Sequence, residues 1–281
     1  MSGSLLPEQV ERYQREGFIA PLPAFTAREV AAIRRDVEAF GRRHNLYEAH
    51  VLRNKAHLKM PSLTQVVEDA RILDVVESIL GPDILCWGSS LFIKEAGAPD
   101  YVAWHQDAYY WDMEPEDVCV VWLALIPSTE ANGAMRVIPG SHLKVLPHGA
   151  SPEGSGNMLF TYEEIAAAID EETAFDCVLA AGEMSVHHMS IVHGSPPNRS
   201  DERRMGYSIT YLAPHVRHGG KRNSARLVRG EDRYGYFAAD PEASREMDPQ
   251  ICAFVDAPFG GGVPVKARTV RPDQNFYRAG A

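Results

Sequence analysis

The sequence has little cysteine and no long hydrophobic run. The cysteines are scattered and form no CxxC pair, at Cys86, Cys119, Cys177 and Cys252. This spacing argues against a zinc ribbon and against a dense disulfide framework. No apolar stretch approaches the ~20 residues of a membrane span, and the N-terminal segment becomes charged too early for a signal-peptide core. We therefore expect a protein of the reducing cytoplasm that does not enter a membrane.

The sequence also lacks an excess of basic residues. It has 28 Lys and Arg against 38 Asp and Glu, a net charge of −10, and no long basic run. This balance argues against nucleic acid as the main partner. No glycine-rich phosphate loop follows a predicted strand. With 281 residues, 45% apolar and 23% charged, the composition is that of a folded globular protein. Because no repeat or low-complexity linker interrupts it, we expect one domain over residues 1–281.

Apolar residues recur at helical spacing over residues 7–80. The pattern predicts three helices, over residues 7–17, 26–44 and 63–80. Gly17 is suited to end the first helix, and Thr26 with Glu29 three residues later forms a capping-box pattern for the second. The N-terminal part is therefore predicted to be helical.

From residue 84 the pattern changes to short segments that are rich in β-branched and aromatic residues. These segments cover residues 84–95, 118–127, 135–139, 182–193 and 206–214. They are typical of strands and favour a mainly β fold, a barrel or jelly roll with flanking helices and a core at about 84–214. We expect one further helix over 161–169, and a mostly irregular tail after Pro214.

The strongest chemical signal is the motif Trp104-His105-Gln106-Asp107. Residues two apart on a strand project from the same face, so His105 and Asp107 are expected to point into one cavity. With one more histidine they form the facial triad of a non-haem Fe(II) oxygenase, which leaves three coordination positions open. A structural zinc site is usually closed by four protein ligands.

The third ligand has several candidates among eleven histidines. His193 ends an apolar strand and precedes a turn, which makes it our first choice. His187 and His188 precede it on the same strand and are alternatives. A basic pair, Arg203-Arg204, opens a strand eleven residues after His193. A guanidinium at the inner end of a barrel is suited to bind the carboxylate of an organic-acid co-substrate.

Three segments, in this order, resemble the phytanoyl-CoA dioxygenase family. They are WHQDAYYW, VWLALIPSTEANGAMRVIPGSH and HHMSIVHGSPPNRSDERRMGYSITYL, within a resemblance that covers roughly residues 8–235. The resemblance implies a cupin-like double-stranded β-helix, or jelly roll, with helices outside. It also implies an enzyme that uses Fe(II), 2-oxoglutarate as co-substrate and O2, and that releases succinate and CO2.

The resemblance also assigns residues to roles. It places the iron ligands at His105, Asp107 and His193, and the arginine that binds 2-oxoglutarate at Arg204. It implies further co-substrate contacts at Gln106, Trp122, Ser195, Ser90 and either Lys55 or Lys59. Because Ala or Gly at position 107 would free a site for chloride, Asp107 indicates transfer of oxygen rather than halogenation.

The substrate is expected to be a small molecule, and the reaction a hydroxylation or an oxidative cyclisation, with antibiotic tailoring in natural-product biosynthesis as the expected setting. Tyr109 and Trp111 follow the metal motif and are predicted to line the substrate mouth. The alternative is a cupin-like protein that binds a metal or a sugar without oxidation. Such a protein would not need an arginine eleven residues after its last ligand.

Overall fold

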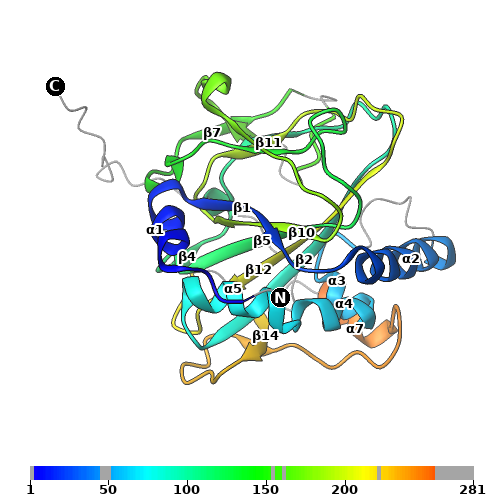
Figure 1. Cartoon of the computed structure of the whole chain (residues 1–281). Helices are drawn as coiled ribbons and strands as arrows, with labels where there is room; N and C mark the ends of the chain where they lie inside the picture. The colour runs from blue at the N-terminus through cyan, green and yellow to red at the C-terminus, as the bar shows by residue number, and fades with distance from the viewer. Residues whose placement is uncertain (1–2, 45–51, 153–155, 160–162, 220–222, 257–281) are drawn as a thin grey trace.

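The structure is a computed structural model, and it describes residues 3–44, 52–152, 156–159, 163–219 and 223–256. The N-terminal part is helical except for β1 (Phe18–Pro23), and the rest is mainly β (Figure 1). The N-terminal helices are α1 (Pro7–Glu16), α2 (Ala27–His44), α3 (Ala56–Lys59), α4 (Pro61–Val67) and α5 (Ala70–Leu80).

The ends of α1 and α2 confirm the predicted signals. Gly17 adopts the left-handed conformation, with φ +79°, and its N–H donates to the carbonyl of Tyr13. The backbone N–H of Thr26 donates to the Glu29 carboxylate at 2.8 Å, and the Glu29 N–H donates to Thr26 Oγ1 at 3.3 Å. These two bonds are the predicted capping box.

The single helix predicted over 63–80 is wrong, because the chain breaks between α4 and α5. Asp69 adopts an extended conformation, and its side chain accepts a hydrogen bond from the Arg71 N–H at 3.0 Å. An aspartate in this position starts a new helix rather than continuing the old one. The helical spacing of apolar residues continues across this break, so the sequence pattern did not indicate it.

Two sheets form the jelly roll. The larger has the order β1-β10-β5-β12-β2-β14-β15, and the smaller β3-β11-β6-β9. The strands that join β1 in the larger sheet are β2 (Ile84–Lys94), β5 (Val118–Ala124), β10 (Glu183–His188), β12 (Arg204–Leu212), β14 (Ser224–Arg229) and β15 (Ala238–Ala239). The smaller sheet contains β3 (Val102–His105), β6 (Met135–Val137), β9 (Phe175–Cys177) and β11 (His193–Ser195). Two short pairs complete the strands, β4 (Met113–Glu114) with β13 (Arg217–His218) and β7 (His148–Ala150) with β8 (Glu163–Ile165).

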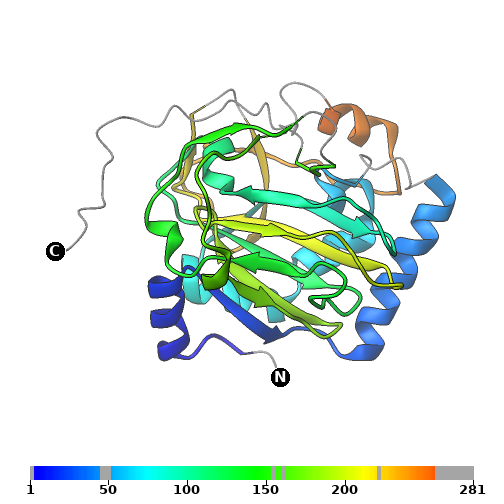
Figure 2. The ribbon, with the colours of Figure 1, turned by 90° about the horizontal axis from the view of Figure 1, so that it is seen from above.

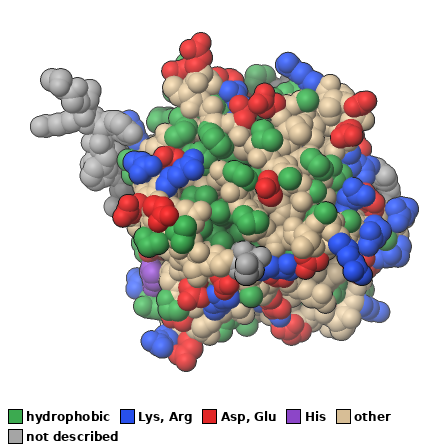
Figure 3. All heavy atoms as spheres, in the orientation of Figure 1, with side chains coloured by type: hydrophobic (Ala, Val, Ile, Leu, Met, Phe, Trp, Pro, Cys, Tyr) green, Lys and Arg blue, Asp and Glu red, His purple; other side chains and the backbone are tan. Residues whose placement is uncertain are grey.

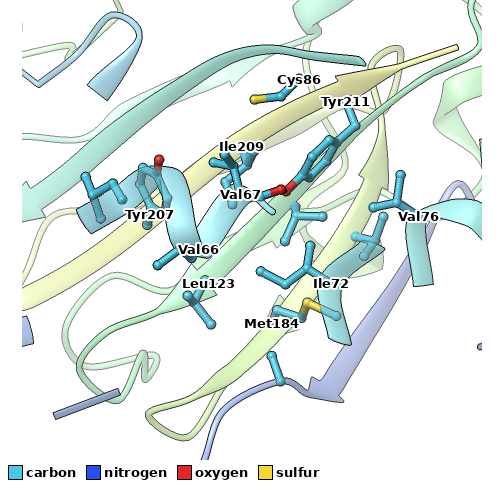
Figure 4. Close-up of a cluster of buried hydrophobic side chains, with 14 of the residues drawn as sticks. Val66, Val67, Ile72, Val76, Cys86, Leu123, Met184, Tyr207, Ile209 and Tyr211 are labelled. Atoms are coloured by element: carbon cyan, nitrogen blue, oxygen red, sulfur yellow. The ribbon is translucent and has the colours of Figure 1, made fainter. Parts of the chain in front are cut away.

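Strand β12 separates the core from the cavity. Its odd-numbered residues Tyr207, Ile209 and Tyr211 pack against α4 and α5 (Figure 4), and the Tyr211 hydroxyl donates to the Val67 carbonyl at 2.9 Å. Because side chains alternate along a strand, the even-numbered residues of β12 face the other side of the sheet. That side carries the candidate site.

One expectation for the second half of the chain is wrong. Residues 163–165 of the predicted helix over 161–169 form β8, which pairs with β7, while 161–162 lie outside the described residues. Pairing here overrides local helix propensity. The described part of the tail after Pro214 is mostly irregular, as expected, but it also contains β14, which pairs with β2 and covers an edge that β2 would otherwise expose.

The last described helix of the chain contacts one of the N-terminal helices. Helix α7 (Pro249–Asp256), orange in Figure 2, packs beside α3, where Lys59 Nζ lies 3.2 Å from Asp256 Oδ1. Among the described helices, none has the length and hydropathy that a membrane crossing requires. Acidic and basic side chains are interspersed on the face in Figure 3. The single domain over 1–281 stays a prediction, because 257–281 lie outside the described residues.

Candidate metal centre

The three predicted metal ligands lie close together at the ends of β3 and β11. His105 ends β3 and lies directly opposite His193 of β11, and Asp107 begins the short helix α6 (Asp107–Tyr110). One ligand atom from each of the three residues lies within 4.8 Å of the other two, and His105 Nε2 is 3.6 Å from Asp107 Oδ1. Two imidazoles and one carboxylate on one side of a cavity form a facial set of metal ligands.

Backbone carbonyls orient both imidazoles. His105 Nδ1 lies 2.8 Å from the Ala103 carbonyl, and His193 Nδ1 lies 3.1 Å from the Ile191 carbonyl. Because a carbonyl only accepts, each Nδ1 carries the hydrogen and each Nε2 keeps its lone pair. Such hydrogen bonds set the tautomer of metal-binding histidines.

The charges also suit a metal. Burial lowers the pKa of His193 well below its ordinary value. Burial raises the pKa of Asp107, but the neighbouring imidazoles of His105 and His193 outweigh this effect, so the net pKa is lowered. A neutral imidazole and an ionised carboxylate are the states that bind a metal. The site therefore needs little deprotonation before it binds one.

The alternative ligands His187 and His188 lie outside this group. His187 lines the cavity, and its ring centroid is 4.8 Å from that of His193. Neither of its ring nitrogens has a hydrogen-bond partner within the described part of the chain, and burial lowers its pKa to about 4. His188 faces the other way, and its Nδ1 accepts from the Ser190 N–H at 3.0 Å. His187 is thus a neutral neighbour of the triad rather than a member of it.

The register of the larger sheet orders the cavity wall. On β12, Ser208 pairs with Trp122 and Ser90, and Thr210 pairs with Val120 and Gly88. Val120 in turn pairs with His187. All of these residues line the cavity together with Arg204 and the triad. The cavity wall therefore extends along β12 from Arg204 to Thr210. Thr210 lies in the same row as His187, which is next to the triad.

Arg204 is a buried cation without a hydrogen-bonded anion. Its side chain is 2% exposed, and its Nε and Nη1 have no hydrogen-bond partner among the described residues. Its Cζ lies 4.7 Å from the ring centroid of Trp122, and a Cβ at Gly206 would overlap that ring. Burial lowers its pKa to about 10, so it stays charged at neutral pH. A buried guanidinium in this state is suited to bind an anion that enters the cavity.

Strand alternation separates the two arginines of the basic pair. Arg203 points outward, and its Nε donates to Glu95 Oε2 at 2.8 Å. Arg204 points inward to the cavity. The geometry thus favours Arg204 over Arg203 as the residue that meets a co-substrate.

Some of the other predicted co-substrate residues line the cavity, and one does not. Trp122, Ser195 and Ser90 line the cavity. Gln106 does not, because its side-chain amide donates to the Lys144 carbonyl at 2.7 Å and its oxygen accepts from the Leu146 N–H at 2.7 Å. The co-substrate contact expected for Gln106 is therefore corrected to a bond that fastens the loop after residue 143.

The two candidate lysines are both paired. Lys55 lines the cavity, but its ammonium lies 2.9 Å from each carboxylate oxygen of Asp240 and also donates to the carbonyls of Trp87 and Ser224. Lys59 points to Asp256, away from the lining residues. Neither ammonium is left for an anion in the way that Arg204 is.

The local backbone corrects the prediction that both Tyr109 and Trp111 line the cavity. Residues 107–110 form a helical turn, so side chains three and four positions after Asp107 share its face. Tyr110 and Trp111 accordingly line the cavity. Tyr109 instead stacks on His148, with 4.0 Å between ring centroids. Of the predicted pair, Trp111 lines the cavity and Tyr109 does not.

Two polar residues near the site were missed. Lys94 is buried beside Arg204, and Asp240 holds Lys55. A lysine that ends the apolar segment Leu91-Phe92-Ile93 was a usable signal for Lys94. Nothing local marks Asp240, because its partner lies 185 positions away.

Comparisons with known proteins agree with this geometry. The family model of phytanoyl-CoA dioxygenase (PhyH) matches residues 13–206. A probable alpha-ketoglutarate-dependent hypophosphite dioxygenase of Stutzerimonas stutzeri is 29% identical over 228 residues, which cover 74% of this chain and 79% of that protein. The ectoine dioxygenase of Bordetella parapertussis is 29% identical over 154 residues, which cover 50% of this chain and only 50% of that protein.

Solved structures share the fold. The non-heme monooxygenase ThoJ in its apo form superposes with a TM-score of 0.76 at 35% identity, covering 86% of this chain and 91% of that chain. CytC3 with Fe(II) and alpha-ketoglutarate superposes with a TM-score of 0.66 at 23% identity, covering 88% of this chain and 98% of that chain. The second likeness concerns the fold alone.

Proposed function

Because the chain belongs to the phytanoyl-CoA dioxygenase family of Fe(II)- and 2-oxoglutarate-dependent oxygenases, we propose that His105, Asp107 and His193 hold the iron. Arg204 binds the distal carboxylate of 2-oxoglutarate at the far end of the cavity. When bound, iron and 2-oxoglutarate supply the oxidation of an unactivated carbon by O2, with release of succinate and CO2.

One observation carries this assignment. The same cavity contains two imidazoles with free Nε2 lone pairs at one end and a buried guanidinium with unpartnered N–H groups at the other. A 2-oxo acid with a second carboxylate fits both ends at once. A cupin-like site that binds only a metal or a sugar gives no reason to bury Arg204.

The chain's own residues have four tasks in the reaction. The triad would hold the metal through His105, Asp107 and His193 and would leave other coordination positions to ligands from the cavity. Arg204 and the Trp122 ring orient the co-substrate. Asp107 stays ionised as a ligand. Buried strands β5, β10 and β12 keep bulk water from the reacting groups.

We propose that the substrate is a small organic molecule that is hydroxylated or oxidatively cyclised, in the tailoring of a natural product. Trp87, Tyr110 and Trp111 give the mouth flat apolar surfaces, and Asn54 and Arg53 add polar groups to the same wall. Such a lining suits a ring-bearing molecule with polar substituents. The relatives are named for chemically unlike substrates, which are hypophosphite, ectoine and phytanoyl-CoA. The mouth, rather than the triad, therefore sets the substrate.

A substrate screen tests this function. The Fe(II)-loaded protein is incubated with 2-oxoglutarate, O2 and a panel of ring-bearing natural-product intermediates, and succinate and the substrate mass are measured. The expected result is succinate above the substrate-free background together with a mass increase of one oxygen or a loss of two hydrogens. Absence of 2-oxoglutarate-dependent succinate, with or without substrate, would contradict the proposal and favour a non-oxidative cupin-like protein.

A further inference from the structure

Lys94 is a second buried cation beside Arg204. It ends β2, is 1% exposed, and lies directly opposite Arg204 in the antiparallel pair of β2 and β12. Directly opposed residues of antiparallel strands project from the same face of a sheet. The two side chains therefore extend to the same side, although only Arg204 lines the cavity.

The ammonium of Lys94 is held by the segment that follows an iron ligand. Nζ donates to Ser195 Oγ at 2.7 Å, to the Ser195 carbonyl at 3.1 Å and to the Pro196 carbonyl at 2.5 Å. Three acceptors match the three N–H groups of an ammonium. Ser195 and Pro196 come two and three residues after His193, so Lys94 fastens β11 to β2 next to the metal centre.

The pair of basic groups has an electrostatic cost. Burial, and then the neighbouring charge of Arg204, lower the pKa of Lys94 to about 6, so a nearby anion is needed to keep Lys94 charged at neutral pH. Its hydrogen bonds to the Ser195 and Pro196 carbonyls hold in either state, because a carbonyl only accepts. A carboxylate bound beside Arg204 would stabilise both cations at once.

The hydroxyl of Ser195 connects Lys94 to the cavity. A hydroxyl oxygen that accepts from Nζ still has its own hydrogen to donate. Ser195 lines the cavity, whereas Nζ lies behind it. With its acceptor side occupied by Lys94, the hydroxyl is directed to donate into the cavity near Arg204.

We propose that Lys94 is a positioning residue for the co-substrate, which holds the Ser195 hydroxyl as a hydrogen-bond donor beside Arg204. The carboxylate that Arg204 binds then receives a further hydrogen bond from Ser195. Lys94 acts through Ser195 and does not itself contact the ligand. This inference rests on the proposed function, because it takes the anion to be 2-oxoglutarate.

The replacement of Lys94 by Met tests this role. Without Nζ, the Ser195 hydroxyl can turn to the carbonyl oxygens that Lys94 now binds, and its hydrogen bond to the ligand is lost. We expect Lys94→Met and Ser195→Ala each to raise the dissociation constant of 2-oxoglutarate roughly ten-fold. The double variant should be no more than about two-fold weaker than the weaker single variant, because both changes remove the same hydrogen bond.

Isothermal titration calorimetry of 2-oxoglutarate into the anaerobic Fe(II)-loaded protein gives these constants. A separate titration with Fe(II) should show metal affinity within about two-fold of the wild type in every variant, because no ligand is changed. Lys59→Met is the matched control, since Lys59 is also a buried lysine but pairs with Asp256 away from the cavity. Its affinity for 2-oxoglutarate should equal that of the wild type.

The outcomes separate this inference from the proposed function. If the wild type does not bind 2-oxoglutarate, the proposed function fails, and this inference with it. If the wild type binds it and Lys94→Met binds equally well, only the inference is overturned. Losses that multiply in the double variant would also overturn it, because Lys94 would then act independently of Ser195. Should Lys94→Met fail to fold, the same cycle is run with Lys94→Leu, which also removes the N–H donors.

Discussion

His105 and His193 lie directly opposite each other on the paired strands β3 and β11, with 4.0 Å between their ring centroids. The strand pairing itself therefore brings together two ligands that are far apart in the sequence. Asp107 joins them because the chain turns into α6 directly after β3. The triad is thus built from backbone register, and its ligands can be replaced with little effect on the core.

Replacement of His193 should abolish metal binding, and replacement of His187 should not. His193→Ala removes a ligand, whereas His187→Ala removes a neighbour outside the triad. Titration with Fe(II) under anaerobic conditions, with circular dichroism as a check of folding, measures the difference. Loss of iron in His187→Ala with retention in His193→Ala would assign the third ligand to His187.

Replacement of Arg204 should weaken 2-oxoglutarate binding without loss of iron. Removal of the charge-assisted hydrogen bonds of a buried guanidinium costs about 1.5–3 kcal/mol, or roughly 10- to 150-fold in affinity. Arg203→Ala is the control, because Arg203 faces Glu95 outside the cavity. Equal losses in both variants of the pair would show that the inward assignment of Arg204 is wrong.

Asp240 should stabilise the fold in a pH-dependent way. Burial raises the pKa of Asp240, but the charges of Lys55 and His57 outweigh it and lower the pKa overall. A lowered pKa stabilises the folded protein above the unfolded value of about 3.9 and loses this effect as the pH falls through the folded value. Asp240→Asn leaves Lys55 buried and unpaired, which should lower the free energy of unfolding by about 3–5 kcal/mol at pH 7.

Urea unfolding at several pH values measures this difference. It should stay constant from pH 8 to about pH 4 and shrink only in stronger acid, where Asp240 of the wild type is itself protonated. Asp256→Asn is the control, because the Asp256 side chain is 66% exposed, and it should change the free energy by no more than about 1 kcal/mol. Equal stability of Asp240→Asn and the wild type at pH 7 would contradict the assignment.

Trp111 should couple co-substrate use to product formation. It packs edge-to-face on Trp87, with 5.1 Å between ring centroids, and both rings line the cavity. Trp111→Ala should keep succinate release without substrate while product formation falls. Tyr109→Phe should leave the ratio of product to succinate unchanged, because Tyr109 faces His148. Full coupling in Trp111→Ala would mean that the aromatic ring serves packing alone.

Local patterns predicted the parts of the fold that depend on neighbouring residues. The capping box of Thr26 and Glu29, the inward and outward arginines, and the grouping of His105 with Asp107 all follow from spacings of one to three positions. The prediction for Tyr109 from its place after the metal motif failed, because the helical turn α6 directs its ring to His148 instead of the cavity. That turn is set by tertiary contacts that no local pattern contains.

Long-range contacts account for most of what the sequence did not predict. Asp240 reaches Lys55 only because β14 joins the sheet beside β2. Lys94 meets Ser195 only because the two sheets face each other, although the two residues are 101 positions apart in the chain. The side-chain amide of Gln106 donates to the carbonyl of Lys144. No spacing within the metal motif indicates this contact.

The visible absorption spectrum of the anaerobic Fe(II)-loaded protein tests the central claim most directly. Addition of 2-oxoglutarate to the wild type should produce a weak charge-transfer band that saturates at one equivalent per chain, because the 2-oxo acid binds the iron held by the triad. The band should be absent in His193→Ala and should need a higher concentration of 2-oxoglutarate in Arg204→Ala. No band in the wild type, or an unchanged band in His193→Ala, would contradict the account.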